Sequence, residues 1–144
     1  MTIMITIPGN PIAKKRPRFA RHGKDTRTYN EQETEESRFL FHFLQQWERQ
    51  PIKGEAVSLG LTFYMKRPKS HFGTGRNAGK VKRSAMVRHT AKPDIDNLVK
   101  FTMDVLNGHA FHDDNLVDSL HVTKEYSEQP RTVILIRTKK HLVI

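Results

Sequence analysis

The strictest constraint on the fold comes from residues 55 to 66, where a large apolar side chain stands at every second position. These side chains are Val57, Leu59, Leu61, Phe63 and Met65. Because successive side chains of a strand point to opposite faces, this spacing predicts a strand with one buried face. Residues 2 to 7 alternate in the same way and predict a first strand, and two more strands are expected near 116 to 126 and 131 to 138.

Two stretches have helical periodicity instead. The first runs from about 31 to 49, after a capping box at Asn30 and Glu33, and its stripe of Phe39, Phe43 and Trp47 is expected in the core rather than as a platform for stacked bases. The second runs from about 94 to 106 and closes at Asn107-Gly108. Its apolar face comprises Ile95, Leu98, Thr102 and Val105. Strands combined with two main helices predict an α+β fold.

Length and composition limit the class of protein. A chain of 144 residues fits a single domain spanning 1 to 144. There is no cysteine, so a disulfide framework and a thiolate zinc site are both excluded. No segment has the length of apolar sequence that a membrane-spanning helix needs, and the first residues show no secretion signal. We therefore expect a soluble protein of the cytoplasm with no membrane partner.

The net charge of +10 is unevenly distributed. Residues 66 to 92 contain nine Lys and Arg and no acid, whereas residues 93 to 126 have a net charge of −5. The glycines and the unpatterned polar residues of 66 to 92 predict a flexible basic loop that contacts nucleic acid, although a merely solvated loop would have the same composition. The basic residues expected to bind nucleic acid are Lys14, Lys15, Arg16, Arg18, Lys80, Lys82, Arg83 and Arg88.

Carboxylates gather around one lysine, Lys100, between residues 92 and 125. They are Asp94, Asp96, Asp113 and Asp114. A basic chain that keeps acids clustered in this way is expected to use them to hold a divalent cation against phosphate. Oxygen ligands suit Mg²⁺, with Mn²⁺ as a possible substitute, and three nearby histidines (His109, His112 and His121) lack a zinc spacing.

The helix geometry separates the roles of these acids. Residues of a helix turn by about 100° each, so Asp94 and Asp96 converge only if Asp94 lies at or before the N-cap. Asp96, Lys100 and Asp104 form one polar stripe, on which we expect Asp104 to make only a surface ion pair. The pair Asp113-Asp114 follows the helix and a short loop, and we expect it to bring a third carboxylate beside the first two.

The motif KPDIDNLVKFTMDVLNG, followed by FHDDNLVDSLHVTKEY, resembles the signature of RusA-type Holliday junction resolvases, which are common in prophages. The early IPGNPIAKKRPRF is similar to the first strand and basic loop of that family. The resemblance implies that Asp94, Asp96, Lys100 and Asp114 are catalytic and that the three acids bind the metal. The basic insert at 66 to 92 is longer than the shortest members of the family carry.

The resemblance also implies a compact domain with a mixed sheet and a homodimer that cuts two strands of four-way junction DNA, in recombination and repair at the nucleoid of a bacterial host. The proposed chemistry is attack of a metal-activated water on a phosphodiester, with Lys100 stabilising charge or orienting the water. Two alternatives remain open. One is a noncatalytic nucleic-acid-binding module whose acids only cap and pair a helix, and the other is a metal nuclease for other branched DNA.

Overall fold

The computed structural model describes the chain except residues 16–17, 24, 30 and 141–144, and it describes no side chain within 16–22 or 24–30. The elements are β1 (Thr2–Pro8), β2 (Arg18–His22), β3 (Asp25–Tyr29), α1 (Glu33–Gln46), β4 (Ala56–Lys66), α2 (Ile95–Leu106), β5 (Val117–Ser127) and β6 (Arg131–Lys139), with short 3₁₀ helices η1 (Lys69–His71), η2 (Gly75–Asn77) and η3 (Asp114–Leu116). The four predicted strands and the second helix are confirmed to within about one residue. Within the described residues, no helix is long and apolar enough to cross a membrane.

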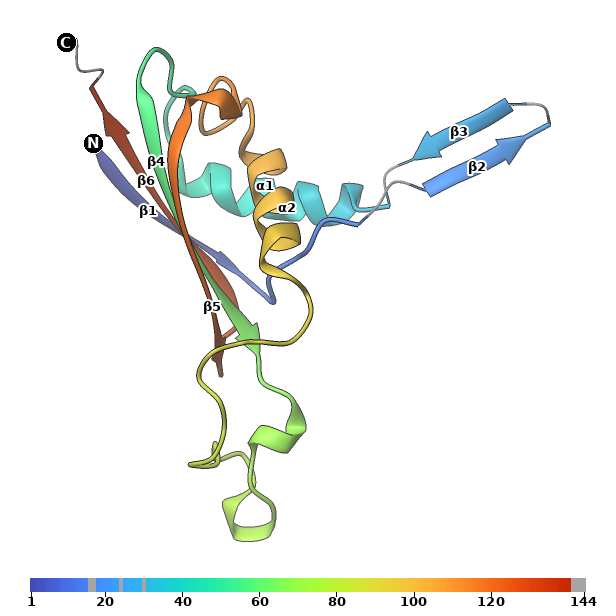
Figure 1. Cartoon of the computed structure of the whole chain (residues 1–144), viewed down its shortest axis with the longest axis vertical. Helices are drawn as coiled ribbons and strands as arrows, with labels where there is room; N and C mark the ends of the chain where they lie inside the picture. Colours follow the sequence, from blue (N-terminus) through green and yellow to red (C-terminus); the bar gives the residue numbers. More distant parts are fainter. Residues whose placement is uncertain (16–17, 24, 30, 141–144) are drawn as a thin grey trace.

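Four strands form one mixed sheet in the order β1-β6-β4-β5 (Figure 1). β6 is antiparallel to both β1 and β4, whereas β4 and β5 are parallel. Parallel neighbours need a long crossover, and here the chain between them contains a projecting segment and then α2. This arrangement confirms the α+β prediction and a single compact domain.

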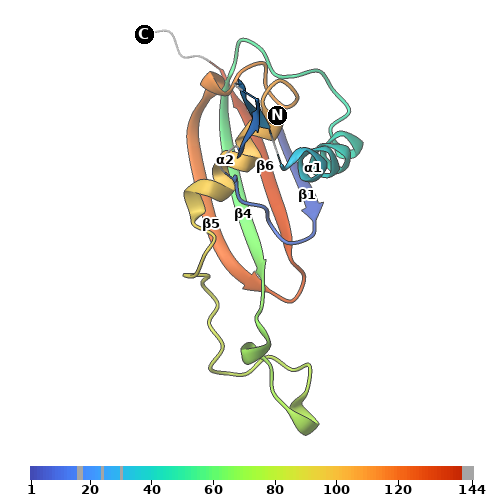
Figure 2. The same ribbon diagram turned by 90° about the vertical axis from the view of Figure 1, so that its right-hand side faces the viewer.

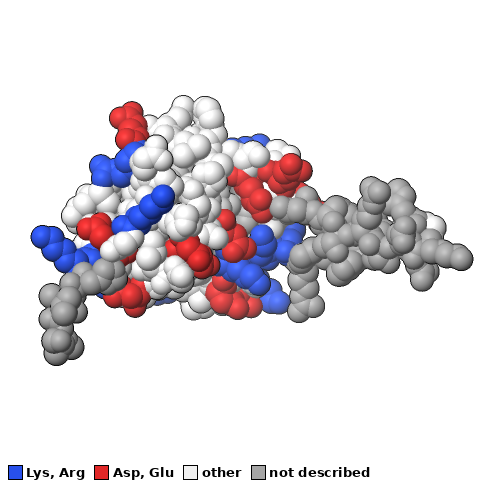
Figure 3. Space-filling model, turned by 90° about the horizontal axis from the view of Figure 1, so that it is seen from above, with Lys and Arg blue, Asp and Glu red and all other residues white. Residues whose placement is uncertain are grey.

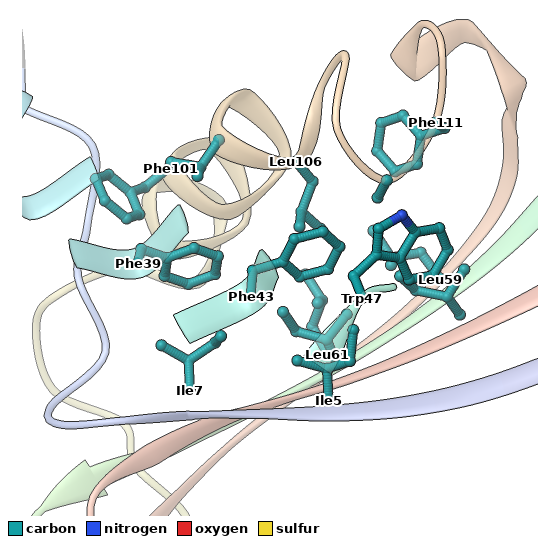
Figure 4. Packing of buried hydrophobic residues seen from close by; sticks show 14 of the residues in the cluster. Ile5, Ile7, Phe39, Phe43, Trp47, Leu59, Leu61, Phe101, Leu106 and Phe111 are labelled. Atoms are coloured by element: carbon teal, nitrogen blue, oxygen red, sulfur yellow. The ribbon is translucent and has the colours of Figure 1, made fainter. Parts of the chain in front are cut away.

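Both helices pack on one face of the sheet (Figure 2). The alternating residues of β4 provide the centre of that face, from Val57 to Met65, each at most 2% exposed. The predicted aromatic stripe of α1 is buried against them, as Figure 4 shows. Phe39 meets Phe101 of α2 edge to face at 5.8 Å between ring centroids, and Phe43 stacks on Trp47 at 5.5 Å. The prediction that these aromatics belong to the core is confirmed.

The beginning of α1 differs from its prediction. The helix starts at Glu33 with Gln32 as its N-cap, and the predicted cap, Asn30, lies outside the described residues. Gln32 is 1% exposed, and its side chain accepts a hydrogen bond from the Lys15 amide and donates one to the Ala13 carbonyl, both at 2.8 Å. The side chain therefore fastens the segment after β1 to the start of α1.

Two segments expected as loops contain regular structure. Strands β2 and β3 pair as a separate hairpin, in the basic loop that was expected to follow the first strand. Neither strand has an alternating apolar face, so hydrophobic periodicity could not predict them. The second is the segment from 67 to 92, here called the arm, which extends away from the sheet and contains η1 and η2 (Figures 1 and 2). The expectation of no regular element in the arm was wrong.

Candidate active site around helix α2

Asp94 occupies the N-cap position of α2, with extended backbone angles of φ −71° and ψ 149°. Asp is one of the preferred N-cap residues, and an N-cap residue usually has extended backbone. Its carboxylate makes no capping hydrogen bond and no ion pair with any described residue. The side chain is exposed, so this acid stands at the positive end of a helix with its oxygens free to bind a cation or a polar ligand.

Asp96 and Lys100 are both exposed and lie one turn apart on α2. Neither side chain forms an ion pair within the part of the chain that the structure describes. The opposite face of the helix, with Leu98, Phe101 and Val105, is buried and fixes the orientation of the polar stripe. The two charged groups are therefore held toward solvent and remain available for a ligand.

Asp104, at the other end of the polar stripe, makes a surface ion pair as predicted. Its partner is Lys14 and not Lys100 of the same stripe. Its carboxylate lies 3.2 Å from the ammonium of Lys14, which also lies 3.6 Å from a carboxylate oxygen of Glu36. The Lys14 amide donates a hydrogen bond to the Asn97 carbonyl at 2.9 Å. Lys14 thus joins α1 to α2, and two carboxylates of the protein lie beside its charge.

Asp113 and Asp114 lie beyond the far end of α2, at the start of η3. The two side chains share a hydrogen bond, which raises the pKa of Asp114, and lost hydration and the charges of Asp113 and Asp104 act in the same direction. Adjacent carboxylates that repel each other are more typical of functional sites than of structural ones.

The expected convergence of Asp114 with Asp94 and Asp96 is not present in the single chain. Among the described residues, no three His, Asp or Glu side chains are close enough together to hold one ion. The reason is the length of α2, because twelve helical residues span about 18 Å, and Asp94 precedes the helix whereas Asp113-Asp114 follows it. The nearby acid that influences Asp114 is Asp104, near the end of α2.

An open groove runs beside Asp94, between the start of α2, the end of the arm and β5. Its lining residues are Arg88, His89, Thr90, Ala91, Asp94, Ile95, Val122, Thr123 and Lys124. Arg88, one of the predicted nucleic-acid contacts, pairs with Glu125 at 3.1 Å while most of its side chain stays exposed. A groove with the exposed guanidinium of Arg88 and the free carboxylate of Asp94 is suited to a phosphodiester and its counterion.

The arm is attached to β5 around Tyr126. The rings of His71 and His89 lie 4.6 and 4.8 Å from the Tyr126 ring, so both limbs of the arm contact the same side chain. Arg67 adds a hydrogen bond of 2.8 Å from its guanidinium to the Met86 carbonyl, which ties the two limbs together. This attachment cannot be predicted from local sequence, because nothing there links Tyr126 to residues more than 30 positions away.

The outer part of the arm is a tight turn that carries exposed cations. A side chain at Gly73 would lie 2.6 Å from Cβ of Asn77, so this position needs glycine for close packing rather than for flexibility. The Gly73 amide donates to the Lys80 carbonyl at 2.9 Å, which closes the turn. Lys80, Lys82 and Arg83 are exposed there and make no ion pair with a described residue. These three cations are free to meet an anionic partner.

On the end of the molecule opposite the arm, the charges are mixed. Figure 3 looks down on the end opposite the arm and shows Lys and Arg interspersed with Asp and Glu rather than gathered into one cationic face. Lys15 is exposed, whereas Arg16 and the side chain of Arg18 lie outside the described residues. Of the predicted nucleic-acid contacts, the structure therefore brings Lys80, Lys82 and Arg83 together on the arm and separates them from Lys14.

Comparison with known proteins shows the family to which the chain belongs. The family model described as endodeoxyribonuclease RusA matches residues 8–137. The uncharacterised protein YqaN of Bacillus subtilis (strain 168) is 33% identical over 140 residues, which cover 94% of this chain and 95% of that protein. The match includes the basic loop after β1, the arm, the start of α2 and the Asp113-Asp114 pair. The chain therefore belongs to the endodeoxyribonuclease RusA family, which indicates an endonuclease that resolves Holliday junctions.

Proposed function

We propose that the protein is a Mg²⁺-dependent endonuclease that cuts four-way junction DNA in recombination and repair, with Asp94, Asp96, Lys100 and Asp114 as its catalytic residues. The observation that carries this proposal is the set of charged side chains around the start of α2 that have no partner in the described chain. Asp94, Asp96 and Lys100 are all exposed, and none is neutralised by a neighbour. These charges are therefore available to a cation or a phosphate.

The donor set fits a hard divalent cation. Asp94 and Asp96 offer carboxylate oxygens, and Mg²⁺ is commonly held by one or two carboxylates together with substrate phosphates and water. When bound, the ion would lower the pKa of a coordinated water and offset charge on the phosphoryl oxygens. Asp94 and Asp96 would hold the ion. Asp114 lies beyond the other end of α2 in the same chain, so we assign it to the metal ligands from its match to the family motif and not from its position beside Asp94.

Lys100 would act on the phosphate rather than on the ion. It lies one turn beyond Asp96 on the same exposed stripe, and its ammonium is not used in an ion pair with a described residue. A long flexible stem allows that charge to approach the scissile phosphate, where a cation stabilises the developing negative charge. The groove beside Asp94, which the exposed guanidinium of Arg88 also lines, would receive the strand that is cut.

The alternative of a noncatalytic binding module requires Asp94 to serve as a helix cap. Its side chain makes no capping hydrogen bond, and Asp96 makes no ion pair with a described residue. The capping alternative therefore loses the interaction on which it depends. Asp104 differs from Asp94 and Asp96 in this respect, because its carboxylate lies 3.2 Å from the ammonium of Lys14 and has a structural role.

The decisive experiment uses purified protein with Mg²⁺ on end-labelled four-way, flap and linear duplex DNA. A homodimer with one site per subunit is expected to make paired cuts, symmetric across the junction, because two-fold symmetry presents two equal sites to opposed strands. Sedimentation of the free protein measures the dimer. Cutting of flaps but not of junctions would establish a nuclease for other branched DNA, and binding without cutting would favour the noncatalytic module.

A further inference from the structure

Lys124, near the middle of β5, holds the segment that leads into α2. Its ammonium donates one hydrogen bond to the Ala91 carbonyl and another to the Pro93 carbonyl, both at 2.9 Å. A lysine ammonium has three donors, so these two bonds commit most of its capacity to the backbone of the protein. The arrangement reaches across about 30 residues of sequence and joins an edge strand of the sheet to the entrance of a helix.

The backbone alone attaches the arm to β5 only as far as His89. The Tyr126 amide donates to the Val87 carbonyl at 2.8 Å, and the His89 amide donates to the Lys124 carbonyl at 3.3 Å. Beyond that point, the Lys124 side chain makes the only hydrogen bonds that tie residues 90 to 93 to the sheet within the described chain. The position of residues 90 to 93, which lead into Asp94, therefore depends on the side chain of Lys124.

The Pro93 carbonyl belongs to the peptide unit that ends at the Cα of Asp94. Because a peptide unit is planar, fixing its carbonyl oxygen also fixes the amide and Cα of the next residue. Asp94 has no hydrogen bond of its own to orient its carboxylate. Its position is thus set by its backbone, and its backbone is set from one side by α2 and from the other by Lys124.

We propose that Lys124 is a positioning residue that sets the carboxylate of Asp94 for cation binding. This inference rests on the proposed function and adds a residue that acts through the backbone and not on substrate. It predicts a particular defect, since a displaced ligand lowers the affinity for the ion while leaving the chemistry possible once the ion is bound. A lysine that only contacted phosphate from the groove would instead change DNA affinity.

The test compares Lys124→Met, which keeps the stem and loses the donors, with Lys124→Arg, whose guanidinium can donate to both carbonyls. Lys139→Met is the matched control, because Lys139 pairs with Asp118 at 2.6 Å and is absent from the groove. Three quantities are measured: Mn²⁺ affinity of the DNA-free protein by electron paramagnetic resonance, the Mg²⁺ concentration for half-maximal single-turnover cleavage, and junction affinity without metal.

Lys124→Met is expected to weaken Mn²⁺ binding by about tenfold and to raise the half-maximal Mg²⁺ concentration by a similar factor, as outer residues that orient a ligand do. Cleavage at saturating Mg²⁺ and metal-free junction affinity should stay close to those of the wild type. Lys124→Arg should recover most of the Mn²⁺ affinity, and Lys139→Met should resemble the wild type. In Asp94→Asn protein, Lys124→Met should cause little further loss, because the two residues act through one carboxylate.

Unchanged Mn²⁺ affinity in Lys124→Met overturns the proposal, and so does a loss confined to metal-free junction affinity. If Lys124→Met does not fold by circular dichroism, Lys124→Gln, which can reach only one carbonyl, is judged by the same criteria. Wild-type protein that binds Mn²⁺ but cuts no DNA refutes the proposed nuclease while Lys124 is still judged from Mn²⁺ affinity. Wild-type protein that binds no Mn²⁺ overturns both.

Discussion

Two acids of α2, eight residues apart on the same stripe, have different surroundings. Asp96 is exposed and has no partner among the described residues, whereas Asp104 is paired with Lys14, which also approaches Glu36. Both residues are aspartates on the same face of α2, so only the residues that pack around each one distinguish them. The contrast supplies a matched pair of substitutions in one helix.

Asp96→Asn is expected to keep the fold and junction binding and to lower cleavage on the order of 10²-fold or more, because it removes charge from the proposed cation site. Asp114→Asn should behave alike. Asp104→Asn should keep most of the activity and cost about 0.5 kcal/mol of stability, the usual value of an exposed ion pair. Cleavage rate in Mg²⁺ and thermal unfolding measure the two effects. Wild-type cleavage by Asp96→Asn protein would remove this residue from the site.

Lys100→Ala is expected to lower the single-turnover rate at saturating protein more than it lowers junction affinity, because the ammonium is proposed to act on the charge of the reacting phosphate. Lys53→Ala, at an exposed position outside the lining of the groove, is the control and should change neither quantity. Quench-flow cleavage and a gel-shift titration provide the two numbers. A variant that binds weakly but cuts at the wild-type rate would make Lys100 an ordinary phosphate contact.

At the scale of elements, the arm is the largest departure from expectation. Composition described it as a flexible loop, yet it has two 3₁₀ helices, a closed turn at Gly73 and a fixed attachment at Tyr126. Its cations are therefore carried on a shaped projection rather than on a structureless chain. Its return limb continues into Asp94, so the arm and the candidate active site are connected through the residues that Lys124 holds.

Replacing Lys80, Lys82 and Arg83 together by Ala should weaken binding to all DNA shapes and reduce the slope of log affinity against log salt by about 0.9 for each lost phosphate contact. Cleavage of bound junction should survive, since no carboxylate is changed. The control replaces Arg38, Arg49 and Lys53, which removes equal charge from exposed positions elsewhere. Equal changes in slope for both triple variants would show that only net charge matters, and a loss limited to four-way junctions would show that the arm senses branch shape.

At the scale of the whole molecule, stability should depend on pH through His89. This side chain is 7% exposed, its Nδ1 has no hydrogen-bond partner among the described residues, and burial, followed by the charge of Lys124, lowers its pKa below the ordinary value of 6.5. Between the ordinary and the lowered pKa, the unfolded chain binds more protons than the folded one. The stability that neutral His89 provides is therefore present above the ordinary value and is lost as pH falls toward the lowered one.

His89→Gln is expected to reduce the fall in the unfolding midpoint between about pH 7.5 and about pH 5 relative to the wild type. The comparison uses the difference between the two pH values, because the substitution also removes a ring that packs on Tyr126. His112→Gln, at an exposed histidine, is the control. If His89→Gln loses as much stability on acidification as the wild type, another group determines the acid sensitivity.

Local sequence patterns predict the four sheet strands, the presence of both helices, the buried aromatic stripe of α1 and the N-cap position of Asp94. These features follow from local periodicity and from the preferences of single residues, and both are carried by adjacent positions in the chain. The family signature is also local, because the residues of the motif lie within two short segments.

Which charges are free of an ion pair depends on contacts between residues that are distant in the sequence. Lys14 was predicted as a nucleic-acid contact from its place in a basic segment, and the packing of α1 and α2 brings Glu36 and Asp104 beside it. The separation of Asp114 from Asp94 depends on the length of α2, which lies between them in the chain. The roles of Lys124 and Tyr126 could not be predicted from neighbouring residues, because their partners lie about 30 or more residues away in the sequence. These partners belong to the long connection between the parallel strands β4 and β5 and reach Lys124 and Tyr126 only in the folded chain. Ion pairs and hydrogen bonds act over a few ångströms, and residues distant in sequence come within that range only when the chain has folded.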